Sequence, residues 1–406
     1  MPSPGRARVA RVIAELRSET RPAARLIWTL PLLSLAAYAA LHATVVPAEM
    51  ADMLVYRAEG AAAAAGGHDL YGLRVTEWDL PATYPPFAAL LFVPTTWLGL
   101  PALKVAVTLG NAALLALLVH LSLRLANWPA PHARRIAVPA AIALGIWLEP
   151  VFQTLHFGQV NLLVTTAVLW DLSRPDGARG KGLAVGLVAG IKLTPAIFAV
   201  HLLLTGRTRA GLTAAGAFLA TAAVGLALLP SASVEFWTLR LFETGRVGKP
   251  WIVDNQSLQG LIARALHTAQ PGPVWSAAAV ATAAAGLAVA ARASRRGDEP
   301  WAVVACAVTA LLVSPISWSH HWVWCVPLLA LLAADAPGIA LGATAVFLAR
   351  TMWLVPHAGV LDLRLPWWQQ PLAAPYPLLG LAFLARTAMR AQSEASSSSA
   401  STMRYA

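Results

Sequence analysis

The chain has 406 residues, of which 58% are apolar and only 12% are charged, and its formal net charge is +11. A soluble domain typically has about 25% charged residues, so this composition argues against a soluble globular protein and indicates a polytopic membrane protein. In a membrane protein, Lys and Arg mark the cytoplasmic loops. The positive net charge is therefore not evidence for a nucleic-acid partner. Cys306 and Cys325 form no Cys-x-x-Cys motif, so the sequence supports neither a zinc site nor a disulfide framework. The chain also lacks the GxxxxGK[ST] motif of ATP-driven pumps.

The two ends of the chain differ from its apolar middle. Residues 1–26 contain six arginines and are predicted to form a basic cytoplasmic segment. The first apolar run, 27–46, is too long for a signal-peptide core and lacks a clean cleavage site, so it is interpreted as an uncleaved signal anchor. Residues 391–406 are rich in serine, which predicts a disordered cytoplasmic tail. Residues 27–390 are then expected to form a single transmembrane domain.

Apolar runs separated by Gly, Pro and Arg clusters follow one another along the middle of the chain. They predict an all-α membrane protein with about eleven or twelve transmembrane helices. With both termini in the cytoplasm, 20 of the 30 basic residues fall inside, which supports this orientation. The orientation requires residues 182–205 either to cross twice as half-spans broken near KLTP or to form a re-entrant hairpin. It also places nearly all the unusual polar motifs on the outer face.

The first of these outer motifs follows the first span. Residues 50–65 are rich in alanine and are predicted to form a helix on the outer membrane surface. Asp52, Tyr56 and Glu59 are spaced i, i+4, i+7 and would share one face of that helix. This face is either the solvated face of an interfacial helix or a site in which a carboxylate acts as general base. Asp52 is the better candidate for a base because it lies closest to the membrane exit of the span.

Two further motifs lie at the mouths of later spans. The sequence TYPPF carries Tyr84, which either lines a site or belongs to a stiff helix start. The sequence HFGQVN supplies His156, Gln159 and Asn161 within six residues. A histidine with uncharged amides suits a ligand rich in hydroxyl groups, and a helix cap at the membrane interface is the alternative.

Lys192 lies in the apolar run GIKLTP, where a charged residue is costly unless it meets an anion or a water-filled cavity. Pro195 breaks the helix beside it, which is tolerated only next to a cavity or other protein. A lysine that faces a phosphate fits both observations, and a lysine that snorkels from a span end is the alternative. In the longest outer loop, DNQSLQG offers the amides of Asn255 and Gln256 to sugar hydroxyls, although such clusters are common in loops.

The sequence SPISWSHHWVW places His320 and His321 among three tryptophans. The tryptophans are typical of an aromatic belt at the membrane interface, and the histidines then either sit in headgroup water or belong to a site. Metal binding by the pair is disfavoured, because neighbours on a helix point about 100° apart and no further ligand completes a set. No metal site is therefore expected.

Taken together and in this order, these motifs resemble the GT-C class of integral-membrane glycosyltransferases. Within that class they resemble glycosyltransferase family 87, the actinobacterial polyprenol-phosphate-mannose-dependent alpha-(1,2)-mannosyltransferases. The resemblance runs from about Ala51 to about Pro327 and is carried by DMLVY, LYG, LPATYPPFAALLF, FGQVNLL, GIKLTPAIF, NQSLQG and SPISWSHHWVW. It implies a GT-C fold and a catalytic transmembrane domain at the plasma membrane, with its active site on the outer face. It also implies inverting transfer of mannose, without metal or cofactor, from a polyprenyl-phosphate donor to a glycolipid or lipoglycan acceptor.

The resemblance further implies roles for the candidate residues. Asp52 in DMLVY matches the family's first-loop aspartate and would act as general base. The leaving phosphate needs charge neutralisation more than a proton, which Lys192 would supply with one histidine of the pair His320 and His321, while the other turns elsewhere. The remaining candidates would bind the sugar or the acceptor: Tyr56, Glu59, Tyr84, His156, Gln159, Asn161, Asn255 and Gln256.

Two alternative functions stay open. Arabinofuranose transfer from an equivalent lipid carrier would keep the same reaction type with a different sugar. A flippase or transporter of lipid-linked sugars would instead distribute polar residues through the bilayer midplane and in both halves of the chain. In this sequence the polar motifs gather on one predicted face, which favours an enzyme that works among membrane lipids.

Overall fold

The computed structural model describes residues 26–45 and 49–402, so nearly all of the predicted basic segment 1–26 lies outside the described residues. The described part of the chain is helical and contains no β-strand, which confirms the all-α prediction. The α-helices are α2 (Thr29–Thr44), α3 (Ala51–Ala64), α4 (Pro86–Phe92), α5 (Leu100–Leu125), α6 (Arg134–Gly145), α7 (Glu149–Phe157), α8 (Asn161–Leu172), α9 (Leu183–Ile191), α10 (Ala196–Leu204), α11 (Thr208–Leu228), α12 (Pro230–Thr238), α13 (Leu258–Ala265), α14 (Gly272–Arg295), α15 (Glu299–Val313), α16 (Cys325–Asp335), α17 (Pro337–Ala349), α18 (Gln370–Ala373) and α19 (Pro375–Thr402). The 3-10 helices are η1 (Leu70–Gly72), η2 (Val93–Trp97), η3 (Arg240–Phe242), η4 (Thr244–Arg246), η5 (Ser319–Trp324), η6 (Thr351–Trp353), η7 (Leu361–Arg364) and η8 (Trp367–Gln369).

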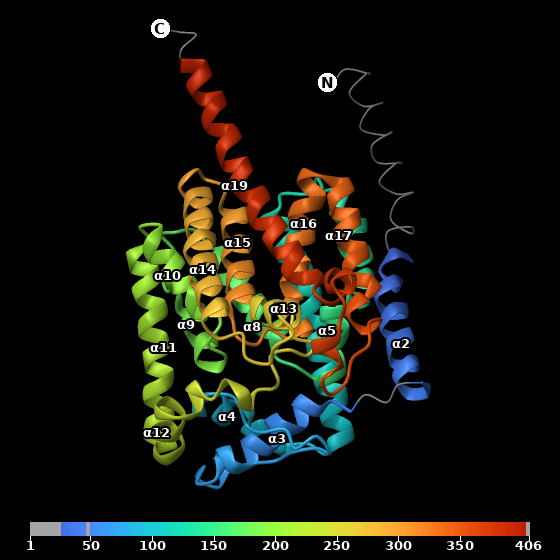
Figure 1. The fold of residues 1–406 in the computed structure, drawn as a ribbon, viewed down its shortest axis with the longest axis vertical. Helices are drawn as coiled ribbons and strands as arrows, with labels where there is room; N and C mark the ends of the chain where they lie inside the picture. Colours follow the sequence, from blue (N-terminus) through green and yellow to red (C-terminus); the bar gives the residue numbers. More distant parts are fainter. Residues whose placement is uncertain (1–25, 46–48, 403–406) are drawn as a thin grey trace, which may run out of the picture.

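The helices form a bundle whose two ends differ (Figure 1). α3 lies across one end, at the bottom of the view, with α4 and α12 beside it. α19 leaves the bundle at the opposite end. The helix predicted over residues 50–65 is thus confirmed as α3, and it runs across the bundle rather than along it.

The described residues include three helices that are long and apolar enough to cross a membrane: α5, α11 and α14. Two bent pairs would raise the number to five, namely α6 with α7 at 63° and the segment 367–373 with α19 at 77°. Four shorter apolar helices are also present: Thr29–Thr44, Pro86–Trp97, Asn161–Leu172 and Glu299–Val313. These apolar helices fit a polytopic membrane protein. The count of eleven or twelve spans stays a prediction.

α9 and α10 form the hairpin that the sequence required around KLTP. Each helix has nine residues and is therefore about 14 Å long, roughly half the hydrocarbon thickness of a bilayer. The ends of the hairpin lie together, because Asp176 pairs with Lys181 before α9 and with Arg207 after α10, at 2.7 and 3.0 Å. The chain thus enters and returns at the same end of the bundle. This arrangement favours the re-entrant hairpin over two crossings, with Lys192 at the apex.

Small residues let the hairpin pack closely against α11. Gly182, Gly186 and Gly190 recur every four residues, and a Cβ atom at Gly186 would lie 2.1 Å from the backbone oxygen of Ala214. This spacing allows helix backbones to approach each other where apolar surroundings provide no hydrophobic driving force. A Cβ atom at Gly190 would meet Thr221, which is the fourteenth of the 21 residues of α11. The apex of the hairpin therefore lies well inside the bundle.

The end of the bundle where the hairpin begins carries a network of ion pairs. Arg207 pairs with Asp176 and with Glu299, and Asp335 pairs with Arg386 and Arg390. The two clusters are joined, since Arg390 also lies 3.5 Å from Asp298, next to Glu299. Four further basic residues lie at this end: Arg174, Arg179, Lys181 and Arg295. We call this end, defined by these residues and the ion pairs above, the basic end. It lies opposite the end that α3 covers (Figure 1).

The last helix, α19, begins at Pro375 and continues to Thr402. That residues 391–406 form a disordered cytoplasmic tail stays a prediction. Residues 403–406 lie outside the described residues.

Candidate active site

A cavity of about 500 Å³, which we call the reaction cavity, lies between α3 and the apex of the α9–α10 hairpin. The loop that follows α12 and the segment around η5 complete its walls. Six of the twelve predicted site residues line it: Asp52, Tyr84, Gln159, Lys192, His320 and His321. They come from distant parts of the chain, and the fold brings them to one place.

Asp52 lies in the first turn of α3 and is half-buried. Burial raises the pKa of this carboxyl from 3.8 to about 6, while a hydrogen bond from Gln159 and the charge of Lys192 lower it and Asp254 raises it. At neutral pH the side chain is mostly an ionised carboxylate. A carboxylate with a pKa close to the working pH is well suited to accept a proton.

Gln159 is held beside Asp52 by two phenols. The Tyr56 hydroxyl donates to Gln159 Oε1 at 2.6 Å, the Tyr84 hydroxyl donates to the same oxygen at 3.2 Å, and the two hydroxyls lie 2.9 Å apart. Because the oxygen is occupied, the amide nitrogen is the atom that remains to donate to Asp52. Tyr56 is buried and does not line the reaction cavity. Its position supports orientation of Gln159 rather than the predicted contact with a sugar.

Gly158 brings Gln159 close to α3. Its φ angle is +68°, a left-handed conformation that glycine adopts readily. A Cβ atom at this position would lie 2.7 Å from the Cβ atom of Met53, the neighbour of Asp52 in α3. A larger residue would therefore push the end of α7 away from the helix that carries Asp52.

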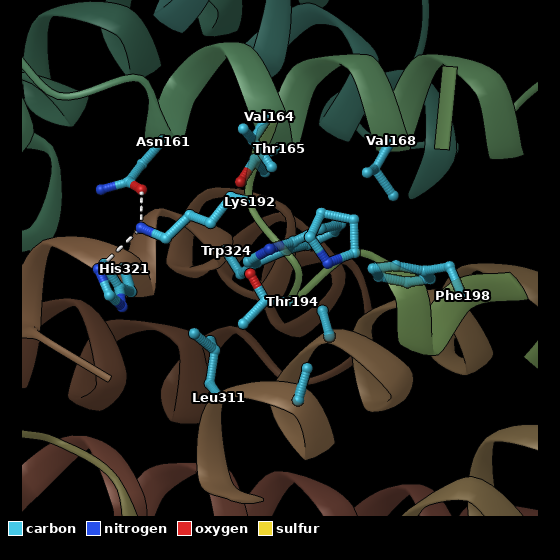
Figure 2. Close-up of a pocket in the computed structure, with 13 residues that line it drawn as sticks. Asn161, Val164, Thr165, Val168, Lys192, Thr194, Phe198, Leu311, His321 and Trp324 are labelled. Carbon is cyan, nitrogen blue, oxygen red and sulfur yellow. Dashed lines mark hydrogen bonds between the residues drawn. The ribbon is translucent and has the colours of Figure 1, made fainter. Parts of the chain in front are cut away.

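Figure 2 shows Lys192 between Asn161 and His321. The Nζ atom of Lys192 donates to Asn161 Oδ1 at 2.9 Å and lies 2.9 Å from His321 Nε2. Among the described residues no carboxylate forms an ion pair with Lys192. Asn161 does not line the reaction cavity but a small adjoining cavity of about 40 Å³. It fixes Lys192, whose charge faces the reaction cavity and is available to an anion there.

Both histidines of the pair line the reaction cavity, and the prediction that only one of them faces the donor phosphate stays a prediction. The backbone oxygen of His320 accepts hydrogen bonds from Asn161 Nδ2 at 3.0 Å and from Thr154 Oγ1 at 3.1 Å. The ring of His321 contacts Lys192. The ring nitrogens of His320 have no hydrogen-bond partner among the described residues. The site therefore contains one histidine bonded to the lysine and one with unused polar atoms.

The tryptophans of the same segment do not form the predicted aromatic belt. Trp322 is 1% exposed and its Nε1 donates to the backbone oxygen of Gln256 at 3.1 Å. Trp324 is also buried and stacks on Phe198. Trp318 lines the reaction cavity. The belt prediction fails because η5 turns the segment into the bundle, where two indoles become part of its core.

The predicted sugar-binding amides Asn255 and Gln256 lie outside the reaction cavity and are fully buried. Asn255 Nδ2 donates to two backbone carbonyls at 2.8 and 3.0 Å. Gln256 Nε2 also donates to two backbone carbonyls, at 2.6 and 2.8 Å. These contacts use the donors that a sugar would need. The structure therefore gives both amides a framework role and does not place them against a ligand.

Asp254, which was not among the predicted site residues, lines the reaction cavity instead. Its Oδ1 accepts a hydrogen bond from the backbone N–H of Ser319 at 3.1 Å, and burial raises the pKa of its carboxyl. The following residue, Asn255, pairs with Trp318 in an isolated β-bridge. Because neighbours in extended backbone point to opposite sides, Asp254 faces the cavity while Asn255 faces the interior. Asp254 could have been identified in the sequence, because it is a carboxylate directly before the two amides of the longest predicted outer loop.

Glu59 and His156 also lie outside the walls of the reaction cavity. Glu59 is 1% exposed and accepts a hydrogen bond from the backbone N–H of Thr83 at 3.2 Å. Burial raises the pKa of Glu59 to about 8, so its carboxyl is mostly protonated at neutral pH. His156 stacks on His42, with the ring centres 5.1 Å apart. In the described ranges no group of three or more His, Cys, Asp or Glu side chains is placed to hold a metal ion.

Comparison with known proteins agrees with this arrangement of motifs. The family model of glycosyltransferase family 87 matches residues 82–315, more than half of the chain. The chain belongs to glycosyltransferase family 87. The resemblance drawn from the motifs is thereby confirmed, and the protein is a glycosyltransferase. Asp52, His320 and His321 lie outside the matched residues, so their roles rest on the geometry.

The chain is also similar to mycobacterial mannosyltransferases. A polyprenol-phosphate-mannose-dependent alpha-(1-2)-phosphatidylinositol mannoside mannosyltransferase of Mycobacterium tuberculosis is 36% identical over 292 residues, covering 68% of each chain. A polyprenol-phosphate-mannose-dependent alpha-(1-2)-phosphatidylinositol pentamannoside mannosyltransferase of the same species is 35% identical over 335 residues, covering 79% of this chain and 77% of the relative. No solved structure matches this family member.

Proposed function

We propose that this protein transfers a mannosyl residue from a polyprenyl-phosphate-linked donor to a mannosylated phosphatidylinositol, forming an alpha-(1,2) linkage. The names of the mycobacterial relatives specify this donor, this linkage and this class of acceptor. The observation that carries the proposal is a single cavity lined by the carboxylate of Asp52 and by the ammonium group of Lys192. An inverting transfer needs these two groups, a base for the acceptor and a positive charge for the leaving phosphate.

The proposed reaction is a direct displacement at the anomeric carbon of the donor. The acceptor hydroxyl oxygen forms a bond to this carbon, and its proton passes to the carboxylate of Asp52. The bond between the anomeric carbon and the phosphate oxygen breaks, and its electron pair stays on the polyprenyl phosphate. Lys192 stabilises the charge that develops on that phosphate, which is a larger effect in a cavity than in water. The ring of His321, whose Nε2 lies 2.9 Å from Lys192 Nζ, lies beside the same charge.

We also propose that the protein is a multi-pass protein of the plasma membrane, with the reaction cavity facing outward and the termini in the cytoplasm. The basic end supports this orientation, because Arg and Lys concentrate on the cytoplasmic side of membrane proteins. The hairpin supports it as well, since both its ends lie at the basic end. A flippase would need polar groups along a route through the bundle, whereas the polar groups of the cavity gather at one end.

The proposed function is tested with membranes that contain the protein. Radiolabelled polyprenyl-phosphate mannose and a mannosylated phosphatidylinositol should give a product that is one hexose longer and has a new alpha-(1,2) linkage by linkage analysis. If the protein uses polyprenyl-phosphate arabinose and not the mannose donor, the transferred sugar is arabinofuranose and the mannose assignment is wrong. In right-side-out vesicles, an added water-soluble donor with a short prenyl chain should be used without permeabilisation. A strict need for permeabilisation would contradict the proposed orientation.

The pH dependence of the reaction tests the contact between Gln159 and Asp52. Because a base must be ionised, kcat/KM should fall as the pH drops through about 6, the pKa of Asp52. In Gln159→Leu the hydrogen bond that lowers this pKa is lost, so the midpoint should move to higher pH. Lys192, which lowers the pKa, and Asp254, which raises it, are unchanged in that variant. A lower rate with an unchanged midpoint would mean that Gln159 acts only on the structure.

A further inference from the structure

The reaction cavity has a buried floor and an open mouth. Gln159 and His320, which line the floor, are each 4% exposed. Trp78 and Val247 line the same cavity but are 49% and 40% exposed, and the wall residue Thr244 is exposed as well. The change from buried to exposed wall residues marks the direction in which the cavity opens. We call the outer part of the wall the mouth, and it consists of Trp78, Arg240, Glu243, Thr244 and Val247.

Two loops that are far apart in the sequence form the mouth and are joined to each other. One loop lies between α3 and α4, and the other follows α12. Arg246, in the second loop, donates from Nη2 to the backbone oxygens of Tyr71 at 2.7 Å and Ala82 at 3.3 Å, both in the first loop. The turn in the first loop that carries the exposed indole is closed by backbone hydrogen bonds between Val75 and Leu80, at 2.9 and 2.7 Å. The mouth is therefore held in shape by hydrogen bonds on both of its sides.

The charges at the mouth are paired with one another. Arg240 donates to Glu243 Oε2 from Nη1 and to Glu235 Oε1 from Nε, both at 2.7 Å. Arg246 lies 3.9 Å from Glu243. These two arginines and two glutamates have no net charge, so they do not favour a phosphate group. Their remaining N–H groups and carboxylate oxygens can donate to and accept from hydroxyl groups.

Trp78 adds a broad apolar surface to these polar groups. An indole ring has a flat apolar face and one N–H donor. A sugar ring has the matching surfaces, with C–H groups on its faces and hydroxyl groups around its edge. An exposed tryptophan can instead anchor a protein at the membrane interface, and Trp97 in η2 fits that role, since it is 76% exposed and lines none of the cavities described. Trp78 differs from Trp97 because it lines the reaction cavity.

We propose that the mouth binds the sugar of the acceptor that follows the reacting one, with Trp78 stacked on the sugar ring and Arg240 and Glu243 bonded to its hydroxyl groups. This inference rests on the proposed function, in which the acceptor is a mannosylated lipid. The reacting hydroxyl would lie beside Asp52, and the rest of the saccharide would extend outward past Trp78. An acyl or prenyl chain at the mouth would cover the ion pairs without bonding to them, which is costly.

Binding of mannotriose, a soluble saccharide without lipid or phosphate, tests the proposal independently of catalysis. Saturation-transfer NMR with the purified full-length protein should show binding, and Trp78→Ala should weaken it by about tenfold because the stacking ring is lost. Trp78→Phe keeps an aromatic face, so its affinity should stay within about threefold of the wild-type value. Trp97→Ala is the matched control and should bind mannotriose as the wild-type protein does.

Three outcomes of this experiment would overturn the proposal. The first is that the wild-type protein does not bind mannotriose, and the second is that Trp78→Ala binds it as well as the wild-type protein. The third is an equal loss in Trp78→Ala and Trp97→Ala, which would mean that both indoles act by anchoring their loops at the membrane surface.

Acceptor kinetics provide a second readout. An alkyl mannoside and an alkyl mannotrioside with the same alkyl chain differ in the sugars that would reach the mouth. In Trp78→Ala, the ratio of kcat/KM for the mannotrioside to that for the mannoside should fall by about tenfold, while the KM for the donor stays at the wild-type value. An equal loss for both acceptors would reveal a structural defect and contradict the proposal. If the wild-type protein transfers no mannose but Trp78→Ala still loses mannotriose binding, the donor assignment fails and the saccharide site stands.

Discussion

Replacing Asp52 by Asn should reduce mannosyl transfer by at least about 10³-fold, within the range expected for loss of a general base. The amide keeps the size of the side chain but cannot take the proton of the acceptor hydroxyl. Asp52 is the carboxylate in the wall of the reaction cavity that also lies at the start of α3, next to Gln159 and within the field of Lys192. Initial rates with radiolabelled donor, in membranes matched for protein content, measure the loss.

Glu59→Gln is the matched control for this substitution. Glu59 lies on the same helix but outside the reaction cavity, and its carboxyl is already mostly neutral because its pKa is about 8. The amide oxygen of Gln can still accept the hydrogen bond from Thr83, so activity should stay within about threefold of the wild-type value. Substantial activity in Asp52→Asn would remove Asp52 as the base. Equal losses in both variants would show that the assay reports the integrity of α3 rather than proton transfer.

Local patterns in the sequence predicted the backbone of the site well. An alanine-rich segment gave α3, because helix propensity acts residue by residue. Lys192 and Pro195 in GIKLTP correctly predicted the break between α9 and α10. An unpaired lysine, and backbone groups without hydrogen-bond partners, both cost free energy in an apolar run. Both of these signals lie within a few residues of the feature that they predict.

Side-chain placement depended on partners that the sequence does not show. Asn255 and Gln256 were interpreted as sugar-binding amides, but their hydrogen bonds reach carbonyls as far away as Ala373. Trp322 was assigned to the membrane interface, yet η5 turns it into the core beside Gln256. A sequence shows which residue types a loop contains, but it does not show the direction in which each side chain points. The β-bridge between Asn255 and Trp318 directs the Asn255 side chain to the interior and leaves Asp254 facing the reaction cavity, the opposite of what was predicted.

Lys192 is expected to govern use of the donor. In Lys192→Met the apolar stem remains and the charge is lost, so kcat/KM for the donor should fall by about 10- to 100-fold, as expected for a hydrogen bond to a charged group. The same charge should hold the product, because polyprenyl phosphate retains the phosphate after transfer. Inhibition by added polyprenyl phosphate should therefore weaken by a similar factor. Initial rates at varied donor and inhibitor concentrations measure both quantities.

Lys104→Met is the matched control for loss of one positive charge. Lys104 is on α5 and lines a separate apolar groove between α2 and α5, not the reaction cavity. Its substitution should leave donor KM and product inhibition at wild-type values. Unchanged product inhibition in Lys192→Met would mean that the phosphate lies elsewhere, and Lys192 would then serve to hold Asn161 and His321 in place. The two roles separate in this experiment because a bound phosphate senses the charge of Lys192 whether or not the reaction proceeds.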